Sequence, residues 1–353
     1  MYPAYTQRFG AHAVGALGLL GIFLLPELVE AFTLLELTVY VIMAILALSL
    51  AFIWGYAGIL CFGQAAFFGV GAYTYALASL NFGDSTAAVV LAVLVPAVFA
   101  LALGSFMFYA RISDVYLGVI TLTVSLILFN LVNSTAGDQY RIGSAPLGGF
   151  NGIPSIPPLN IPFYPEIVLG PEQVYQVSAA CLLLVYFGLR AILSSRFGRI
   201  VVGIRENGMR AELLGYDIRR YRLGAFVIGG AIAGLAGCLF ANWGSFVSPT
   251  VFGLAQSAQI IIWVIVGGLG TLFGPIVGCF LIQWLTAWLG AANLLNSNLV
   301  LGLILVVFVL AVPKGVLPTL AGLLALRQRQ APPHPVAPQA GTRHREAINQ
   351  AGK

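Results

Sequence analysis

The residues best suited to specific chemistry are the charged side chains of one hydrophilic segment, residues 194–222. Part of it, residues 205–215, mixes arginines and glutamates with apolar Met209 and Leu213 and ends on Gly215, a residue that commonly stops a helix. This pattern predicts a short amphipathic helix that another protein could bind. An arginine-rich loop that only fixes membrane topology would have the same composition, and the spacing favours neither interpretation.

Metal, redox and imidazole chemistry have little support. Each cysteine lies within an apolar stretch without the paired spacing of a metal or redox motif, so the cysteines are expected to serve packing. The three histidines lie near the chain ends. No catalytic residue, metal site or cofactor is therefore predicted. The residues concerned are Cys61, Cys181, Cys238, Cys279, His12, His334 and His344.

Composition places the chain in a membrane. Of its 353 residues 59% are hydrophobic and 8% are charged, whereas soluble domains carry about 25% charged residues. Glycine, at 41 residues, is also frequent, as it is where helices pack closely in lipid. Long uncharged runs do not fit the alternating strands of a β-barrel. The sequence predicts an all-α integral membrane protein that contacts lipid and not nucleic acid.

About ten transmembrane helices are predicted, since ten apolar runs approach the roughly 20 residues that a spanning helix needs. With both termini in the cytoplasm, every Lys and Arg except Arg141 falls inside, and more than half of the Asp and Glu residues fall outside. This asymmetry indicates a multi-pass membrane protein with both termini in the cytoplasm. The predicted spans are residues 13–29, 34–54, 59–80, 87–109, 115–133, 174–193, 223–243, 254–266, 271–289 and 299–312.

The charges leave one region undecided, because the run from Leu223 to Val312 contains no charged residue. Since Arg222 and Lys314 both fall inside, the number of full crossings between them must be even. Four crossings are predicted, although two crossings and a re-entrant hairpin would agree equally well with the charges.

The membrane-spanning domain is predicted to cover residues 1–326. Residues 134–172, rich in Pro, Gly and Asn, predict an ordered periplasmic loop, and residues 194–222 predict a cytoplasmic loop. Residues 327–353 have almost no apolar anchor, which predicts a disordered cytoplasmic tail.

Two glycine-rich breaks, residues 58–71 and 267–278, each follow an Ile-Trp pair, which indicates a weak internal repeat. Paired interrupted spans often mark a solute path. Gln64 adds an amide that is costly to bury without a partner. The residues predicted to line a path are Gly63, Gln64, Phe67, Thr121, Trp263, Gly267 and Gly268. Helix packing is instead predicted for the glycines of GxxxG steps, Gly230, Gly234, Gly274 and Gly278.

Hydroxyl side chains alternate along the fifth predicted span at Thr121, Thr123 and Ser125. Such hydroxyls usually bond back to their own helix, and facing a polar conduit is the alternative.

From about residue 40 to residue 318 the sequence carries, in order, the motifs Tyr56-Ala57-Gly58, Gly63 to Tyr73, Phe197-Gly198-Arg199 to Gly215-Tyr216, Tyr221-Arg222-Leu223, Ala233 to Gly237, Ser248-Pro249 and Val266 to Thr271. Together they resemble the M-type permeases of the Liv branched-chain amino acid ABC importers. The resemblance implies a non-enzymatic permease subunit of the bacterial inner membrane that works with an H-type permease subunit, cytoplasmic ATP-binding subunits and a periplasmic solute-binding protein.

The resemblance also implies that residues 205–215 form the coupling helix that docks in a groove of the ATPase. The coupling residues are Arg205, Glu206, Asn207, Met209, Arg210, Ala211, Glu212, Leu213 and Gly215. The sequence lacks a G-x-x-x-x-G-K-[ST] phosphate loop, which agrees with ATP hydrolysis by a partner chain.

Two alternatives stay open. Urea and short-amide importers share these motifs, so the family resemblance does not fix the solute. A stand-alone uniporter or channel for small neutral solutes belongs to another class, and it predicts transport by this chain alone. The centres of the predicted spans carry no charged residue, which removes the usual machinery of a proton symporter.

Overall fold

Runs of Leu, Val, Ile and Ala make the described residues mostly helical in the computed structural model, and all of them belong to one compact unit. They are residues 18, 21–22, 24–110, 112–137, 139–162, 164–291 and 302. The predicted tail lies outside them, as do most of the predicted tenth span and part of the first.

Five of the described helices are long and apolar enough to cross a membrane. One of them, α2 (Ala31–Leu50), continues as the π-helix η1 (Ala51–Tyr56). The other four follow predicted spans to within a few residues: α4 (Ser85–Tyr109), α5 (Asp114–Ser134), α6 (Pro171–Ser194) and α9 (Ile218–Gly244). The predicted all-α membrane class is confirmed at this level.

Three further helices are shorter or less apolar, namely α3 (Gln64–Phe82), α10 (Leu254–Gly267) and α11 (Phe273–Ala291). The span predicted over residues 59–80 is wrong at its start, because residues 57–63 form an irregular connection and α3 begins only at Gln64. Gly58 has a φ of 69°, which a right-handed helix does not allow. At 14 residues, α10 is too short for a full crossing by itself.

Helix α3 packs mainly against α4 and α9. A Cβ added at Gly71 would lie 2.3 Å from the carbonyl oxygen of Gly234, and one at Gly237 would lie 2.0 Å from that of Phe68. Only glycine permits backbones to approach this closely. The packing predicted for Gly234 is therefore confirmed.

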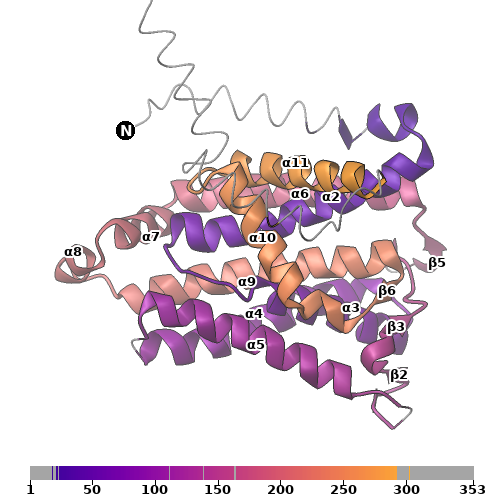
Figure 1. Ribbon diagram of the computed structural model, residues 1–353, viewed down its shortest axis with the longest axis horizontal. Helices are drawn as coiled ribbons and strands as arrows, with labels where there is room; N and C mark the ends of the chain where they lie inside the picture. Colours follow the sequence, from indigo (N-terminus) through magenta and orange to yellow (C-terminus); the bar gives the residue numbers. More distant parts are fainter. Residues whose placement is uncertain are drawn as a thin grey trace, which may run out of the picture. The chain divides into compact units, whose positions relative to one another are not determined.

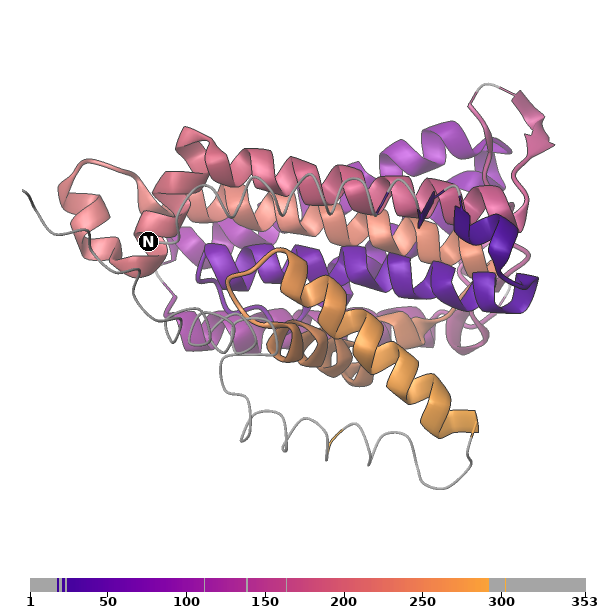
Figure 2. The same ribbon diagram turned by 90° about the horizontal axis from the view of Figure 1, so that it is seen from above.

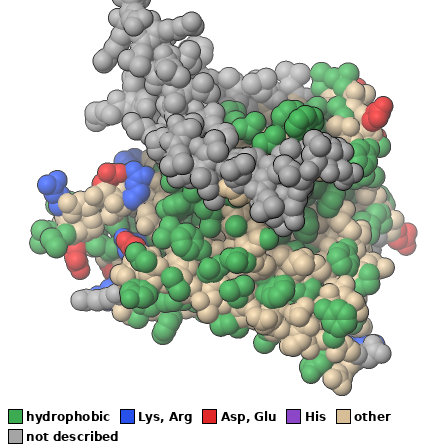
Figure 3. All heavy atoms as spheres, in the orientation of Figure 1, with side chains coloured by type: hydrophobic (Ala, Val, Ile, Leu, Met, Phe, Trp, Pro, Cys, Tyr) green, Lys and Arg blue, Asp and Glu red, His purple; other side chains and the backbone are tan. Residues whose placement is uncertain are grey.

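The long helices have chemically different ends. Helices α7 (Arg196–Glu206) and α8 (Gly208–Leu213) lie at one end, and the short strands lie at the other (Figures 1 and 2). We call these the α7–α8 end and the strand end. On the face drawn in Figure 3, charged side chains gather at both ends and the surface between them is largely apolar. This is the distribution expected of helices whose middles lie in lipid.

Three two-stranded antiparallel sheets lie at the strand end. They pair β1 (Arg141–Ile142) with β2 (Ala145–Pro146), β3 (Ile153–Pro154) with β6 (Phe246–Val247), and β4 (Asn160–Ile161) with β5 (Tyr164–Val168). Because β6 directly follows α9, the β3–β6 pair ties the segment between α5 and α6 to the end of α9.

Asn160 connects the same segment to the turn between α3 and α4 through hydrogen bonds. The Asn160 side chain accepts a hydrogen bond from the backbone N–H of Ser85 at 2.8 Å and donates one to the Asp84 carboxylate at 3.0 Å. Asp84 also caps α4 by accepting from the backbone N–H of Thr86 at 3.0 Å. The Thr86 and Asn160 hydrogen bonds lower the pKa of Asp84 below its ordinary value of 3.8.

Candidate functional site

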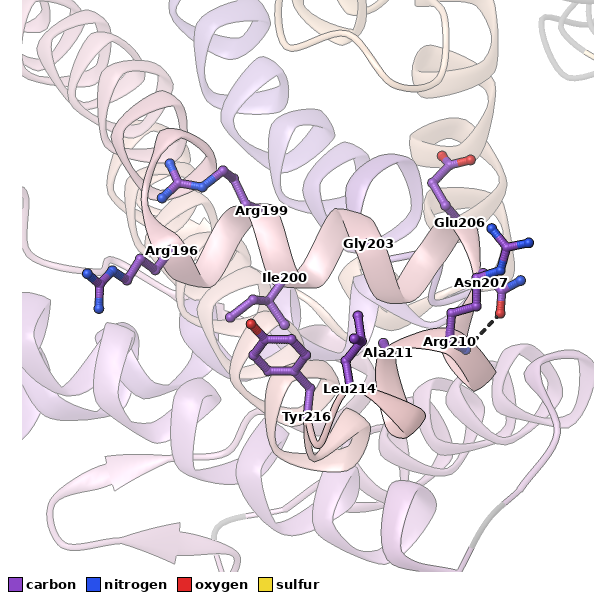
Figure 4. Close-up of a pocket in the computed structure, with 10 residues that line it drawn as sticks. All are labelled: Arg196, Arg199, Ile200, Gly203, Glu206, Asn207, Arg210, Ala211, Leu214 and Tyr216. Atoms are coloured by element: carbon purple, nitrogen blue, oxygen red, sulfur yellow. Dashed lines mark hydrogen bonds between the residues drawn. The ribbon is translucent and has the colours of Figure 1, made fainter.

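The helix predicted over residues 205–215 is two helices in the structure. Helix α7 ends at Glu206, and Asn207 is extended, with φ −158° and ψ 94°. Its side chain accepts a hydrogen bond from the backbone N–H of Arg210 at 2.9 Å and so caps α8 (Figure 4). The prediction of a single helix is wrong, because Asn207 caps a second helix, α8. Arg205 and Glu206 therefore belong to α7. The predicted stop at Gly215 is confirmed by its φ of 87°.

Helix α8 exposes large apolar side chains outside the apolar middle of the protein. Met209 is 75% exposed, Leu213 is 83% exposed and Leu214, at the helix C-cap, is 76% exposed. Ala211 is buried, so one face of the helix packs and another stays free. Exposed apolar side chains that gather among charges make this face a candidate interaction surface.

A shallow groove of about 670 Å³ lies beside this surface, between α7 and the chain around α8 (Figure 4). Among the described residues neither Arg196 nor Arg210 has an ion-pair partner, and Glu206 already pairs with Arg205. The groove therefore has a positive balance of charge. Its lining residues are Arg196, Arg199, Ile200, Gly203, Glu206, Asn207, Arg210, Ala211, Leu214 and Tyr216.

Arg205 is directed towards the bundle and does not line this groove. Its Nη1 donates a hydrogen bond to the backbone carbonyl of Gly55, in η1, and its Nη2 pairs with Glu206. The side chain is 33% exposed.

The first interrupted segment, residues 57–63, is held by a hydroxyl on α5. The backbone N–H groups of Phe62 and Gly63 donate to Oγ1 of Thr121 at 3.2 and 3.3 Å. This hydroxyl also donates back to the Gly118 carbonyl at 2.9 Å, so the predicted back-bonding is correct but incomplete. A Cβ at Gly63 would lie 1.9 Å from the Thr121 carbonyl oxygen. Gly63 is therefore required for this contact.

Gln64 begins α3 in a buried site, with 1% of its surface exposed. Its amide nitrogen donates to the Ser49 hydroxyl at 2.8 Å and to the Gly229 carbonyl at 3.3 Å. The expectation that a buried amide needs partners is met. Sequence reasoning missed both partners, which lie on α2 and α9 and leave no local signal.

A second interrupted segment, residues 245–253, connects α9 to α10. Ser245 has a φ of 47°, and the chain then forms β6 and the 3-10 turn η3 (Pro249–Phe252). The Ser125 hydroxyl donates to the Phe252 carbonyl at 2.8 Å. The Phe252 ring stacks on Tyr73 of α3, with centroids 5.6 Å apart. Back-bonding was thus the wrong expectation for Ser125.

The glycine turn between α10 and α11 brings these helices close together. A Cβ at Gly267 would lie 2.1 Å from the Gly274 carbonyl oxygen, and one at Gly278 would lie 2.3 Å from the Trp263 carbonyl oxygen. Packing is confirmed for Gly274 and Gly278. Gly267 makes the same kind of contact.

All of the residues predicted to line a path are buried within this chain. Residues 57–63 bring Gly63 and its neighbour Gln64 close to Thr121 on α5, whereas Trp263, Gly267 and Gly268 lie at the α10–α11 contact.

Some buried polar atoms on α3, α9 and α10 have no hydrogen-bond partner among the described residues. They are Oη of Tyr73, Nε of Arg222, Oδ1 of Asn242, Oγ of Ser257 and Nε1 of Trp263. Leaving such atoms without a partner is costly. They are therefore groups that water or a polar solute would stabilise. In the part of the chain that the structure describes, no group of three or more His, Cys, Asp or Glu side chains could hold a metal ion.

Long apolar helices, two interrupted segments and a charged interaction surface at one end define a multi-pass membrane protein with the features of a transport permease. Residues 33–310 match the family described as branched-chain amino acid transport system / permease component, and the chain belongs to this family. It is accordingly a transport permease and not an enzyme.

Two curated relatives cover most of the chain. The high-affinity branched-chain amino acid transport system permease protein LivM of Salmonella typhimurium is 30% identical over 321 residues, which are 83% of this chain and 72% of that protein. Its namesake in Escherichia coli is 29% identical over 86% of this chain and 74% of its own length. The probable branched-chain amino acid transport permease protein LivH of Methanocaldococcus jannaschii is 27% identical over 42% of this chain and 50% of its own. No solved structure shows a significant match.

Proposed function

We propose that this chain is the membrane-spanning permease subunit of an ABC importer for branched-chain amino acids, and that a separate cytoplasmic subunit hydrolyses ATP. The observation that carries the proposal is the free apolar face of α8, with Met209 and Leu213 exposed beside an arginine-rich groove. This face inserts into the ATPase, and Arg210 and Glu212 at its edge fix the orientation. The names of the LivM relatives support the choice of solute.

The arginines of α7 and α8 support a cytoplasmic location for this end, and with it a periplasmic location for the strand end. On this orientation both termini are cytoplasmic, the domain of residues 1–326 crosses the membrane an even number of times, and residues 327–353 form a cytoplasmic tail. The solute-binding protein then docks at the strand end. An H-type permease subunit, related to this chain through LivH, completes the membrane part.

The solute path runs along α5 and the two interrupted segments. Gly63, Gln64, Phe67, Thr121, Trp263, Gly267 and Gly268 line it when these segments move apart. The unpartnered indole N–H of Trp263 supports this assignment, since a passing solute or water would satisfy it.

The exposed face of α5 supports the same route. Tyr116, Thr123 and Asn130 are exposed and follow one another at seven-residue steps, which places them on one side of the helix. Thr123 lies in mid-span and Asn130 nearer the end of the helix, and such hydroxyl and amide groups are better placed against a protein or a polar path than against lipid. The H-type subunit therefore faces α5.

The test is reconstitution of the chain with its H-type, ATPase and binding-protein partners in liposomes. We expect ATP-dependent uptake of radiolabelled leucine. The variant Met209→Asp with Leu213→Asp should insert normally but lose the co-purifying ATPase and the uptake. Arg220→Gln is the control, because Arg220 is an exposed arginine whose one ion pair within the described part of the chain is with Asp217.

Other outcomes separate the alternatives. Uptake of urea or a short amide in place of leucine would favour the related importers. Uptake by this chain alone, without ATP, would establish a uniporter or channel and reject the proposal.

A further inference from the structure

Arg205 joins α7 to the turns that end two different helices. Its Nη1 donates to the Gly55 carbonyl at the end of η1. A Cβ at Gly58 would lie 2.7 Å from Cγ of Arg205, so the aliphatic part of the side chain lies directly over Gly58. A Cβ at Gly270, in the turn between α10 and α11, would lie 3.9 Å from Nη1.

The two turns also touch each other. A Cβ at Gly55 would lie 3.0 Å from the backbone nitrogen of Gly270. Gly58 and Gly270 have φ angles of 69° and 82°, which favour glycine. Because glycine has no Cβ, both positions leave room for a close neighbour. One guanidinium group thus lies where the first interrupted segment and the α10–α11 turn meet.

The same residue lies directly before α8 in the chain. Val201 and Ile204 of α7 are buried, and Asn207, two residues after Arg205, caps α8. A displacement of α8 therefore moves Arg205, and the planar guanidinium pulls on the carbonyl that it binds.

We propose that Arg205 is a positioning residue that transmits movement of α7 and α8 to the turns at Gly55–Gly58 and Gly270, and that it is not a docking contact. This inference rests on the proposed function. It separates two roles within residues 205–215: α8 binds the ATPase, and Arg205 passes the movement inward.

The experiment uses the complete reconstituted importer and measures three quantities for each variant: co-purification of the ATPase, ATP hydrolysis, and leucine taken up per ATP hydrolysed. Arg205→Met keeps the aliphatic stem over Gly58 and removes every donor. We expect normal co-purification and hydrolysis with about tenfold less leucine per ATP, the factor that loss of a hydrogen bond from a charged donor corresponds to. Arg205→Lys keeps the stem and one charged donor, and should restore part of the ratio. Arg220→Gln should leave it unchanged.

Two results would overturn the inference. An unchanged leucine-to-ATP ratio in Arg205→Met would show that the contact transmits nothing, and loss of the ATPase would make Arg205 a docking residue. If Arg205→Met does not insert into the membrane, Arg205→Lys becomes the deciding variant. A wild-type leucine-to-ATP ratio in Arg205→Lys, at normal co-purification of the ATPase, would then overturn the inference. Failure of the wild-type chain to bind any ATPase would instead reject the proposed function.

Discussion

Thr121 and Ser125, one turn apart on α5, each hold a different interrupted segment of the chain. Oγ1 of Thr121 accepts hydrogen bonds from the segment that precedes α3, and Oγ of Ser125 donates one to the segment that precedes α10. The two segments are far apart in sequence, yet they share one support. Movement of either segment would therefore strain or break a hydrogen bond to α5.

Thr121→Val should lower the free energy of unfolding by about 1–3 kcal/mol, because the buried N–H of Gly63 and the partly buried N–H of Phe62 lose their acceptor. The thermal unfolding midpoint of the detergent-solubilised protein measures this. Thr123→Val is the matched control, since Thr123 is exposed and bonds only to the Val119 carbonyl of its own helix. Equal midpoints for the two variants would contradict the support role.

The shared support predicts coupling between the two hydroxyls. In a double-mutant cycle of Thr121→Val and Ser125→Ala, the combined effect on stability should differ from the sum of the single effects by at least about 0.5 kcal/mol. Additive effects would show that the two segments are held independently.

Gly63→Ala should disrupt the start of α3, because the new Cβ would overlap the Thr121 carbonyl oxygen. We expect the free energy of unfolding to fall by more than about 2 kcal/mol, or folded protein not to be recovered. Gly188→Ala in α6 is the control. Among the described residues, no atom beyond the backbone of α6 itself and the adjacent residues lies within 4 Å of a Cβ there, so the helix should gain up to about 1 kcal/mol. Size-exclusion profiles and melting midpoints distinguish the two, and a well-folded Gly63→Ala protein would argue against the close contact.

Asp84 makes the stability of the protein depend on pH. Because folding lowers its pKa, the carboxylate contributes stability at pH values above 3.8, and this contribution is lost as the pH falls through the lowered value. Asp84→Asn keeps a capping oxygen but removes the charge. Its melting midpoint should lie below that of the wild type at about pH 6, and the gap should shrink towards about pH 3. A gap that does not change with pH would show that the charge is unimportant.

The sequence was informative where structure follows from local composition. The spans at α4, α5, α6 and α9 were predicted because uncharged runs in lipid must be helical, and the stop at Gly215 followed from helix capping. A capping signal at Asn207 was also present and was overlooked, although an asparagine before a new helix is typical.

The contacts of Gln64, Thr121 and Ser125 could not have been predicted from one sequence. Gln64 binds Ser49 and Gly229, and Ser125 binds Phe252, across separations that leave no periodic pattern. Residue types identified polar groups that needed partners in the membrane. Only the fold shows which partners they have.

The burial of α3 has a consequence for how the protein is made. This helix is among the less apolar ones, and it depends on close backbone contacts with α9, which is synthesised much later. We therefore expect that, during translation, α3 stays at the membrane surface or at the insertion machinery until α9 has been synthesised. Ribosome-bound chains truncated before α9 should leave α3 accessible to water-soluble thiol reagents at an engineered cysteine, and the full-length chain should protect it.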